Sequence, residues 1–516
     1  MEVNFLCLLL SLPFLVLVLR LLFHKLSRNK NLPPSPPSLP IIGHLPYLKH
    51  PLHHTLRSLS DKYGPVLFLQ FGSQPTVIVS SLQVAEECFT KNDIVLANRP
   101  NWTTWKYFGY NFTTILASNY GEHWRNLRKV SAIEIFSTHR LNVLMGIGRD
   151  EIRRLVQKLS MGSLQAFNRV ELRSKLTELA FNIMMRMVVG KRYFGDDVLD
   201  DEKSKEFRYI VKEVVTNSGA TNHAEFLPIL RWMGYGGFNK RMLRLFKRTD
   251  VFLQGLIDEH RRKKIDGSEI KNTMIDHLLS LQESEPNYYT DEIIKGLILV
   301  MLLAGTDTSS VTLEWALSYL VNHPDVLEKA KNEIDAQIGI DCLIDEPDVL
   351  KLHYLQNIIY ETLRLKPAAP LLPPHRASED WQIAGYNVPL NSMVLVNAWA
   401  ILRDPMLWDD HTSFKPERFE AGPGELNKEA HKLMLPFGLG RRACPGAPLA
   451  QRVVGLTLGS LIQYFDWKRV SQDPVDLSEG KGLTMPKAVP LEAMCRARPI
   501  LHKALSGESS KTIKGE

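Results

Sequence analysis

The sequence predicts one large domain that is mainly α-helical with small β-sheets and that lies behind an N-terminal membrane anchor. Three observations lead to this prediction. The chain starts with an apolar run, several later segments carry apolar residues at three- and four-residue spacing, and only a few short segments have strand-like composition. No linker is visible beyond residue 40, so we expect a single domain over residues 41–505 and a polar tail at 506–516.

The apolar run covers residues 5–19 and continues past Arg20 to Phe23. A helix over residues 3–23 would be about 30 Å long, which matches the core of a bilayer. Glu2 precedes the run and basic residues follow it, an order opposite to that of a cleaved signal peptide. We therefore predict a single-pass anchor over residues 1–24, with the rest of the chain in the cytosol by the positive-inside rule.

Residues 25–40 form a basic and proline-rich hinge, in which 32–40 read LPPSPPSLP. Proline fixes φ and favours an extended chain, so we expect a stiff spacer between the anchor and the domain. Beyond it, residues 66–80 have β-branched and aromatic residues on both sides of a turn, which predicts a hairpin. Helices are predicted at 172–189, 293–321, 325–338 and 355–365, and strands at 381–388 and 393–396.

Composition excludes some classes of function. The net charge of +7 is mild for this length, and no run of Lys and Arg is dense enough to predict nucleic-acid binding. Such a charge suits an acidic partner or an anionic membrane, or simply a slightly basic enzyme. The five cysteines are far apart and form no CxxC pair, which argues against a disulfide framework and against a cysteine zinc site.

Residues 436–450, PFGLGRRACPGAPLA, surround the single Cys444 with glycines and two adjacent arginines. A thiol becomes a good metal ligand only as the thiolate, which needs nearby positive charge, N–H donors or the metal itself. The glycines permit backbone conformations that bring N–H groups close to a sulfur. A buried free cysteine would be the default interpretation of this residue taken alone.

Two further motifs lie on predicted helices. Glu361 and Arg364 share a helix face, and by themselves they would form an ordinary exposed ion pair. Residues 304–309, AGTDTS, place polar residues and a glycine inside a long apolar helix at a cost in stability. The glycine can leave room for a small ligand, and a threonine there can bond a backbone carbonyl and distort the helix; a structural kink is the alternative.

A basic helix face is predicted around Trp124 and Arg128, which are i,i+4 neighbours and can reach the same anionic group. Taken alone, such a face is more often simply solvated. With the other motifs, however, it stands in a recognisable order along the chain. The pattern Phe437-x-x-Gly440-x-Arg442-x-Cys444-x-Gly446 resembles the haem-binding signature of the cytochrome P450 family, and the resemblance covers essentially the whole chain.

Residues 482–499 and the cysteine loop look like microsomal plant members of this family. They are similar to the group of isoflavone hydroxylases, lignan methylenedioxy-bridge enzymes and related terpenoid and xenobiotic hydroxylases. The resemblance implies the cytochrome P450 fold, with haem b bound through the thiolate of Cys444 as axial iron ligand. It further implies that Asp307 and Thr308 relay protons during oxygen activation.

The resemblance also implies roles for three larger sets of residues. The haem contacts would be Trp124, Arg128, Ala304, Gly305, His375, Phe437 and Arg442. The structural core that holds the cysteine loop would be Glu361, Arg364 and Arg418, the last in the sequence PERF at 416–419. The substrate pocket would be lined by Trp105, Phe108, Val300, Met301, Ala369, Leu371 and Met485.

The activity implied is insertion of one oxygen atom from O2 into a C–H bond of a hydrophobic plant metabolite, a phenolic such as an isoflavonoid, a lignan or a terpenoid. Electrons would come from NADPH through a cytochrome P450 reductase at the endoplasmic reticulum membrane. Four basic residues are candidates for the reductase-facing surface, although each could be ordinary solvated charge: Arg125, Lys129, Lys432 and Arg441.

Other outcomes are compatible with the same motifs. A haem-thiolate enzyme can instead form a methylenedioxy bridge, demethylate or rearrange its substrate, and the sequence does not name the substrate. A haem protein that performs no monooxygenation, or a decayed binding protein, is disfavoured because Asp307, Thr308 and the ligand set are all retained.

Overall fold

The computed structural model describes residues 15–16, 31–195, 202–218, 222–232, 237–266, 273–339, 344–420 and 434–501. Nearly all of the predicted anchor (1–24), part of the hinge (25–30) and the polar tail (506–516) lie outside these described residues. Within the described chain the protein is mainly helical with small sheets, as predicted.

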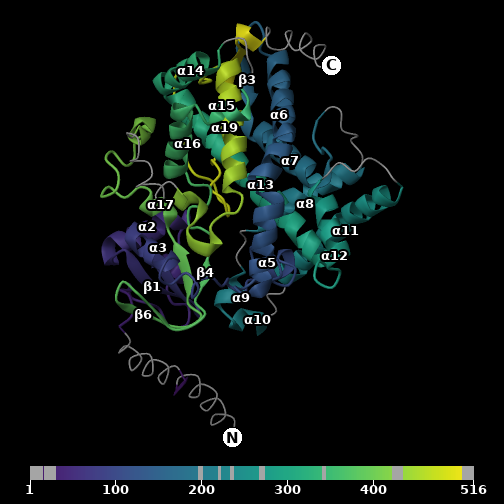
Figure 1. Cartoon of the computed structure of the whole chain (residues 1–516). Coiled ribbons are helices and arrows are strands. Elements are labelled where there is room, and N and C mark those ends of the chain that lie inside the picture. Colours follow the sequence, from purple (N-terminus) through teal and green to yellow (C-terminus); the bar gives the residue numbers. More distant parts are fainter. Residues whose placement is uncertain are drawn as a thin grey trace.

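The helix α13 (Asp291–Asn322) runs through the centre of the molecule (Figure 1). The Thr290 side chain caps its N-terminus by accepting a hydrogen bond from the backbone N–H of Ile293, and acidic residues fill its first turn. The chain turns at His323, and Pro324 then occupies the first turn of α14 (Pro324–Ile338), where its missing N–H costs nothing. Both helices agree with the sequence prediction to within two residues at each end.

α13 is also the one helix, among the described residues, whose length and apolarity would allow it to cross a membrane. Its side chains are instead mostly buried inside the protein. It packs along α7 (Leu172–Val189), which has the bounds predicted from the sequence. Further helices complete the same apolar core: α6 (Thr138–Met161), α11 (Gly237–Ile265), α12 (Met274–Ser284), α16 (His353–Leu365) and α19 (Ala447–Tyr464).

The largest sheet has the order β1-β2-β7-β4 and lies at one end of the helical body (Figure 1). β1 (Val66–Phe71) and β2 (Gln74–Val79) form the predicted hairpin, and β7 (Met393–Val396) pairs with β2 in parallel. β4 (His375–Arg376) adds to β7 and brings His375 to the sheet edge that faces α13. A second sheet consists of three strands in the order β3 (Asn168–Glu171), β9 (Glu492–Ala497) and β8 (Phe465–Lys468). A third sheet pairs β5 (Trp381–Ile383) with β6 (Tyr386–Val388).

The proline-rich stretch at 32–40 contains no helix or strand, in agreement with an extended chain. It does not stand away from the domain. The backbone N–H of Phe68 in β1 donates to the carbonyl of Pro34 at 2.9 Å, and that of Asn387 in β6 donates to the carbonyl of Asn31 at 2.7 Å. The second half of the hinge is therefore fastened to the sheets.

Candidate active site

The cysteine loop is held by its own backbone. The N–H of Cys444 donates to the carbonyl of Phe437 at 2.8 Å, and Gly438 and Gly440 both adopt positive φ, of 77° and 68°. A Cβ atom at position 440 would lie 2.5 Å from Oδ1 of Asp93, so the close approach of that loop also requires glycine. Two residues after Gly440, Arg442 ends a short 3-10 turn that turns the chain toward Cys444.

Cys444 lies just before α19, so its thiol sits at a helix N-terminus. The side chain has exposed surface, but that surface faces an internal cavity and the thiol is surrounded by protein. Burial raises the pKa of the Cys444 thiol, whereas the N–H groups of Gly446 and Ala447 and the charge of Arg128 act to lower it. A thiol in this position, deep and facing N–H donors, becomes a thiolate ligand when a metal cation is present.

The cavity lies between the cysteine loop, α13 and the segment that joins α16 to β4. The space open to the centre of a water molecule is about 310 Å³, and its walls are mostly apolar. Ala304 is exposed although it belongs to the buried helix α13, because it faces this cavity. Twelve of the sequence-predicted residues line it: Trp124, Arg128, Val300, Met301, Ala304, Gly305, Thr308, Ala369, His375, Phe437, Arg442 and Cys444.

Positive charge gathers at one side of the cavity without a matching acid. Arg99, Arg128 and Arg442 all line it, and no described carboxylate forms an ion pair with any of the three. Arg128 donates to the carbonyl of Ala443 at 2.7 Å, and Arg442 donates to the carbonyl of Ala97 at 2.8 Å. The guanidinium groups of Arg128 and Arg442 therefore donate to backbone carbonyls and not to carboxylates.

These arginines are electrostatically strained. Burial, together with the charges of Arg99 and Arg128, lowers the pKa of Arg442 to about 8, and burial lowers the pKa of Arg99 to about 9. The Nε atom of Arg99 is buried and has no hydrogen-bond partner among the described residues. A ligand that carries carboxylates would relieve this strain, because paired and hydrogen-bonded charges tolerate burial far better than isolated ones. The donor set thus fits a flat, dianionic group whose metal is bound by Cys444.

Two predicted cofactor contacts make bonds within the protein. The indole N–H of Trp124 donates to the carbonyl of Ile115 at 3.1 Å, and its ring stacks against the guanidinium of Arg442, 4.5 Å away. Nδ1 of His375 lies 2.8 Å from the carbonyl of Leu96. Burial lowers the pKa of His375 well below its usual range, so its imidazole is neutral. Both side chains stand fixed at the edge of the cavity.

The acid and alcohol of the α13 motif point in different directions. The hydroxyl of Thr308 faces the cavity and donates to the carbonyl of Ala304 at 2.6 Å. Asp307 is not part of the cavity lining, and its carboxylate accepts a 2.5 Å hydrogen bond from the hydroxyl of Thr484. Burial raises the pKa of Asp307, while the Thr484 hydroxyl and the charge of Arg173 oppose the rise.

Gly305 has a packing role that the sequence did not reveal. A Cβ atom there would lie 2.6 Å from the sulfur of Met184, a side chain of α7 that also lines the cavity. Glycine at this position therefore allows α7 to approach α13 closely, and Met184 takes the space that a side chain would fill.

The predicted structural core is a buried ion network away from the cavity. Glu361 accepts hydrogen bonds from Arg364 Nε at 2.6 Å and from Arg418 Nε at 3.0 Å, and the carboxylate is completely buried. Arg364 continues to the backbone carbonyls of Leu402 and His411 at 3.0 and 2.8 Å. The network ties α16 to the segment 402–419 that precedes the cysteine loop.

Four of the seven predicted pocket residues do not line the cavity. Trp105 packs against Trp102 with ring centroids 5.0 Å apart, and Phe108 belongs to the main apolar core. Leu371 packs against the core beside the large sheet. Met485 is buried, and its carbonyl accepts from the indole N–H of Trp315 at 2.7 Å.

Fold and site together define a haem-thiolate protein: a mainly helical body, a cysteine at a helix N-terminus, and a cavity with an apolar wall and a cationic edge. Comparison with known proteins agrees, since the model of the Cytochrome P450 family matches residues 33–491. The chain therefore belongs to the cytochrome P450 family, an enzyme family of oxygen-dependent monooxygenases, and membership implies a haem with thiolate-bound iron.

Plant relatives match over nearly the full length. Cytochrome P450 81E8 of Medicago truncatula is 57% identical and covers 96% of this chain and 98% of its own length. Isoflavone 3'-hydroxylase of Medicago truncatula is 55% identical, with 95% and 98% covered. A (+)-piperitol/(+)-sesamin synthase of Sesamum radiatum is 51% identical, with 98% and 99% covered.

The solved structures also include a similar chain. A zebra fish cytochrome P450 determined with abiraterone superposes with a TM-score of 0.72 at 25% sequence identity. The match covers 86% of this chain and 99% of the fish chain, so the two share the fold over almost the whole of the described body.

Proposed function

We propose that this protein is a membrane-anchored monooxygenase that inserts one oxygen atom from O2 into a C–H bond of a hydrophobic plant metabolite. Its substrate belongs to one of three classes: phenolics such as isoflavonoids, lignans, or terpenoids. The observation that carries the proposal is that the Cys444 thiol and the Thr308 hydroxyl open onto the same apolar cavity. A charged substrate would find few partners on these walls beyond the arginine edge that the cofactor needs.

In the proposed holoenzyme Cys444 would bind the haem iron, and Arg99, Arg128 and Arg442, which line the same cavity, would bind the haem carboxylates. When bound, the haem supplies oxygen activation, which the electron-donating thiolate favours. The described residues do the rest. Val300, Met301 and Ala369 give the cavity an apolar wall that positions the substrate and excludes water.

Protons reach the cavity through α13 in this proposal. The raised pKa of Asp307 means that its carboxyl holds a proton over a wider pH range than an exposed aspartate does. The Thr308 hydroxyl, one residue further along, faces the cavity and can pass a proton on while it is held by the Ala304 carbonyl. Transfer requires the Asp307 carboxyl to exchange its Thr484 bond for a partner on the cavity side.

We further propose four parts of the chain: an anchor over 1–24, a hinge over 25–40, the catalytic domain over 41–505 and a tail over 506–516. The anchor holds the enzyme in the endoplasmic reticulum membrane with the domain facing the cytosol. NADPH supplies electrons through a cytochrome P450 reductase. The attachment of residues 31 and 34 to the sheets supports a fixed orientation of the domain relative to the anchor.

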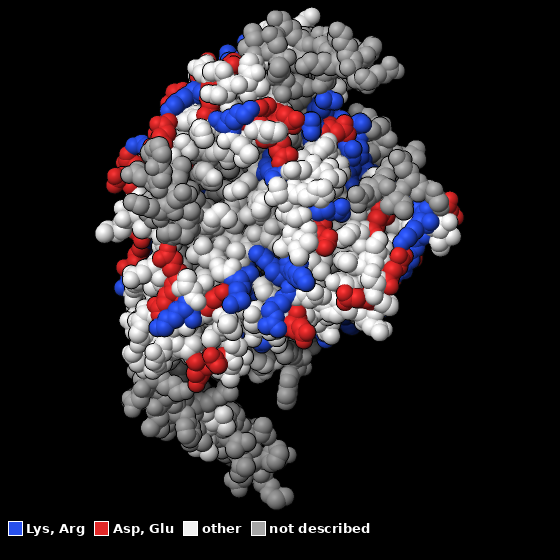
Figure 2. Space-filling model, in the orientation of Figure 1, with Lys and Arg blue, Asp and Glu red and all other residues white. Residues whose placement is uncertain are grey.

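The reductase would dock on the basic face that includes α5 (Glu122–Val130), where Arg125 and Lys129 are exposed. Figure 2 shows basic side chains gathered near the middle of this face. Arg441 takes part less freely, because it is paired with Asp93 at 3.3 Å, and Lys432 lies outside the described residues. Lys129→Glu should slow turnover at limiting reductase, whereas Lys468→Glu, an exposed control on β8, should not; equal rates would contradict the docking face.

The alternative to hydroxylation is another outcome: formation of a methylenedioxy bridge, demethylation or rearrangement. Of these, the relative named as a (+)-piperitol/(+)-sesamin synthase supports bridge formation. One experiment tests the function and distinguishes the outcomes. The enzyme, a plant reductase and NADPH are incubated with isoflavonoids, lignans and diterpenoids under isotopically labelled O2. A product that gains one labelled oxygen supports hydroxylation, a product that loses two hydrogens supports bridge formation, and no oxygen-dependent product in any class would contradict the proposal.

A further inference from the structure

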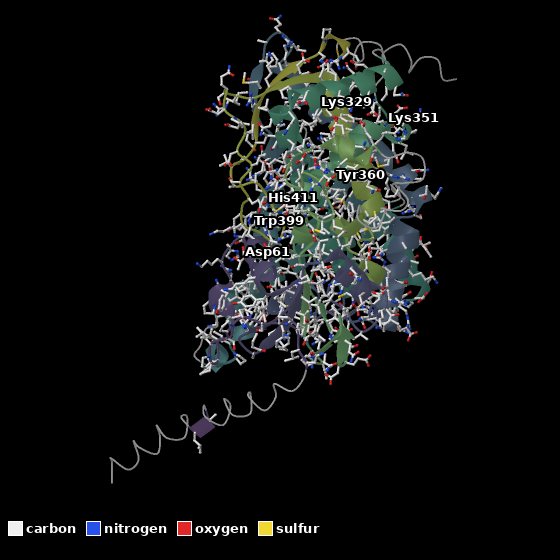
Figure 3. All side chains as sticks on the ribbon, turned by 90° about the vertical axis from the view of Figure 1, so that its left-hand side faces the viewer. Asp61, Lys329, Lys351, Tyr360, Trp399 and His411 are labelled. Carbon is white, nitrogen blue, oxygen red and sulfur yellow. The ribbon has the colours of Figure 1, made fainter. Side chains whose placement is uncertain are left out.

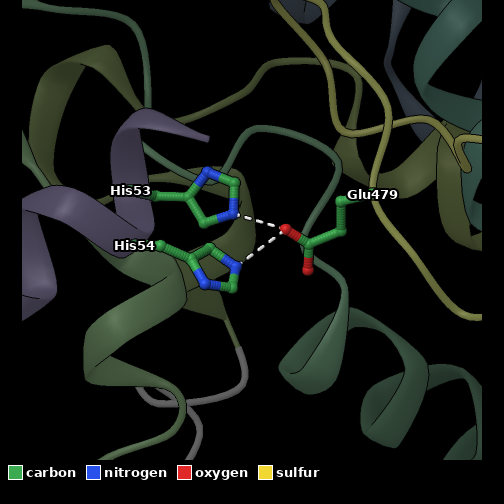
Figure 4. A group of neighbouring side chains, drawn as sticks. All are labelled: His53, His54 and Glu479. Atoms are coloured by element: carbon green, nitrogen blue, oxygen red, sulfur yellow. Dashed lines mark hydrogen bonds and ion pairs between the residues drawn. The ribbon is translucent and has the colours of Figure 1, made fainter. Parts of the chain in front are cut away.

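Three potential metal ligands converge outside the cavity described above. His53 and His54 lie in the first turn of α2 (Leu52–Tyr63), and Glu479 lies in the C-terminal loop that follows β8 (Figure 4). Both imidazole Nε2 atoms approach the same carboxylate oxygen, Oε2 of Glu479, at 2.7 and 3.0 Å. None of the three residues lines the cavity.

The geometry is close to that of a bound cation. The ligand atoms of the three residues all lie within 4.8 Å of one another. A tetrahedral zinc ion with ligand bonds of about 2.0–2.1 Å would hold its ligand atoms roughly 3.3 Å apart. The two imidazole-to-carboxylate distances would therefore open by roughly 0.6 and 0.3 Å, and each neutral imidazole would carry its proton on Nδ1, so that the lone pair of Nε2 faces the metal.

The surroundings fix these ligands in place. The ring of Trp399 packs against both imidazoles, with centroid distances of 5.0 Å to His53 and 4.3 Å to His54. Trp399 lies on the outer face seen in Figure 3, on the same side as Asp61 of α2. The second carboxylate oxygen of Glu479 accepts from Lys366 Nζ at 2.6 Å, which leaves Oε2 aimed at the histidines.

The groups around the three ligands both attract and repel a cation. Nε2 of His53 faces Oε2 of Glu479 at 2.7 Å, so a cation placed between them would meet a ring nitrogen and a carboxylate oxygen. The Glu479 carboxylate supplies negative charge for a cation, although its other oxygen already accepts from Lys366 Nζ at 2.6 Å. The Lys366 ammonium, and more distantly Arg403, repel a cation and will limit its affinity.

Access to the cluster is also available. The side chain of His54 is 48% exposed, whereas those of His53 and Glu479 are almost buried. A metal could therefore enter from the His54 side and keep a water molecule there as its fourth ligand. Two imidazoles and one carboxylate are the ligand types that zinc prefers, while magnesium and calcium prefer oxygen-only sites.

We propose that His53, His54 and Glu479 form a binding site for a zinc-like divalent cation that ties α2 to the C-terminal loop. The loop is a stiff platform, because Glu479 pairs with Lys487 in a β-bridge and Gly480 N–H donates to the carbonyl of Pro486 at 2.7 Å. It also carries Thr484, the partner of Asp307. A cation that binds only the folded chain stabilises it by mass action.

The test uses the full-length, haem-loaded protein purified through a tag without histidine and stripped of metals by chelation. Zinc is titrated by calorimetry, with magnesium as the comparison metal. His54→Gln removes the most exposed of the three ligands, and His50→Gln, an exposed histidine just before α2, is the matched control. We expect His54→Gln to weaken the zinc site by about tenfold or more, His50→Gln to leave it unchanged, and magnesium to give no comparable heat.

A thermal melt provides a second readout. Zinc should raise the melting temperature of the parent protein and of His50→Gln, and raise that of His54→Gln much less. Anomalous diffraction from zinc-soaked crystals should place a peak between His53, His54 and Glu479. Equal zinc binding by the parent and His54→Gln, or a peak elsewhere only, would overturn the proposal and leave the cluster as a plain ion-pair network around Glu479.

Discussion

The hydroxyl of Thr484 donates a 2.5 Å hydrogen bond to Oδ2 of Asp307, although the two residues are 177 positions apart in the chain. The C-terminal loop therefore holds the acid of α13 on the side away from the cavity. This bond is one of the forces that oppose the burial-driven rise in the pKa of Asp307. It makes Thr484 a positioning residue for the proposed proton relay.

Thr484→Val tests this relationship. Valine cannot donate the bond, so the pKa of Asp307 should rise further above its ordinary value and the carboxyl should keep its proton to higher pH. If Asp307 acts as the proton donor, the alkaline limb of the kcat/KM profile moves to higher pH. Thr484→Ser retains a hydroxyl and should resemble the parent. Identical profiles for the valine variant and the parent would contradict the role of Thr484.

The arginine edge predicts an effect on haem retention. Arg99→Gln removes a buried charge that we place beside a cofactor carboxylate, and a hydrogen bond to a charged group contributes about 1.5–3 kcal/mol. Haem affinity should fall roughly tenfold or more, measured as the ratio of haem to protein after gel filtration. Arg57→Gln, which removes an arginine paired with Asp61 on α2, is the control and should retain its haem. Full retention by Arg99→Gln would remove Arg99 from the cofactor site.

The buried network around Glu361 predicts a large loss of stability. Glu361→Gln leaves Arg364 buried without its full counter-charge, and breaking a buried ion pair costs about 3–5 kcal/mol. Arg169→Gln, which breaks an exposed pair with Glu492, should change stability little. Urea unfolding of both variants measures the difference. A Glu361→Gln protein as stable as the parent would show that the network does not hold the fold.

Close packing between α7 and α13 predicts a coupling between two residues. Gly305→Ala forces a methyl group against the sulfur of Met184 and should cost about 1–3 kcal/mol. Met184→Ala removes that obstruction, so the double variant should be more stable than the sum of the single effects predicts. Unfolding midpoints of the four proteins complete the cycle. If the two single effects on stability simply add, the contact between positions 305 and 184 does not couple α7 to α13.

Local patterns predicted the elements well. The helix at 172–189 and the hairpin at 66–80 agree with α7 and with β1–β2 because periodicity, capping residues and turns act over a few residues. Side-chain neighbours were harder to predict. Trp105 and Phe108 belong to an aromatic segment, and composition cannot distinguish an aromatic ring that lines a cavity from one that fills a core.

Other parts of the site have no sequence signal of their own. Arg99 stands outside the motifs that we singled out, and its approach to Arg442 depends on how the chain between them folds. Met184 lines the cavity only because Gly305 lets α7 come close. The Thr484–Asp307 bond likewise depends on where the C-terminal loop lies against α13. Such contacts depend on tertiary structure, and local sequence patterns do not predict them.

The central claim, that Cys444 gives its thiolate to a haem iron, is tested most directly by the carbon monoxide difference spectrum of the reduced protein. The parent should show the red-shifted Soret band of thiolate-bound haem. Cys444→Ser should lose that band and its oxygenase turnover, while its far-ultraviolet circular dichroism stays that of a folded helical protein. A parent protein without the band, or a serine variant that keeps both the band and the turnover, would contradict the account.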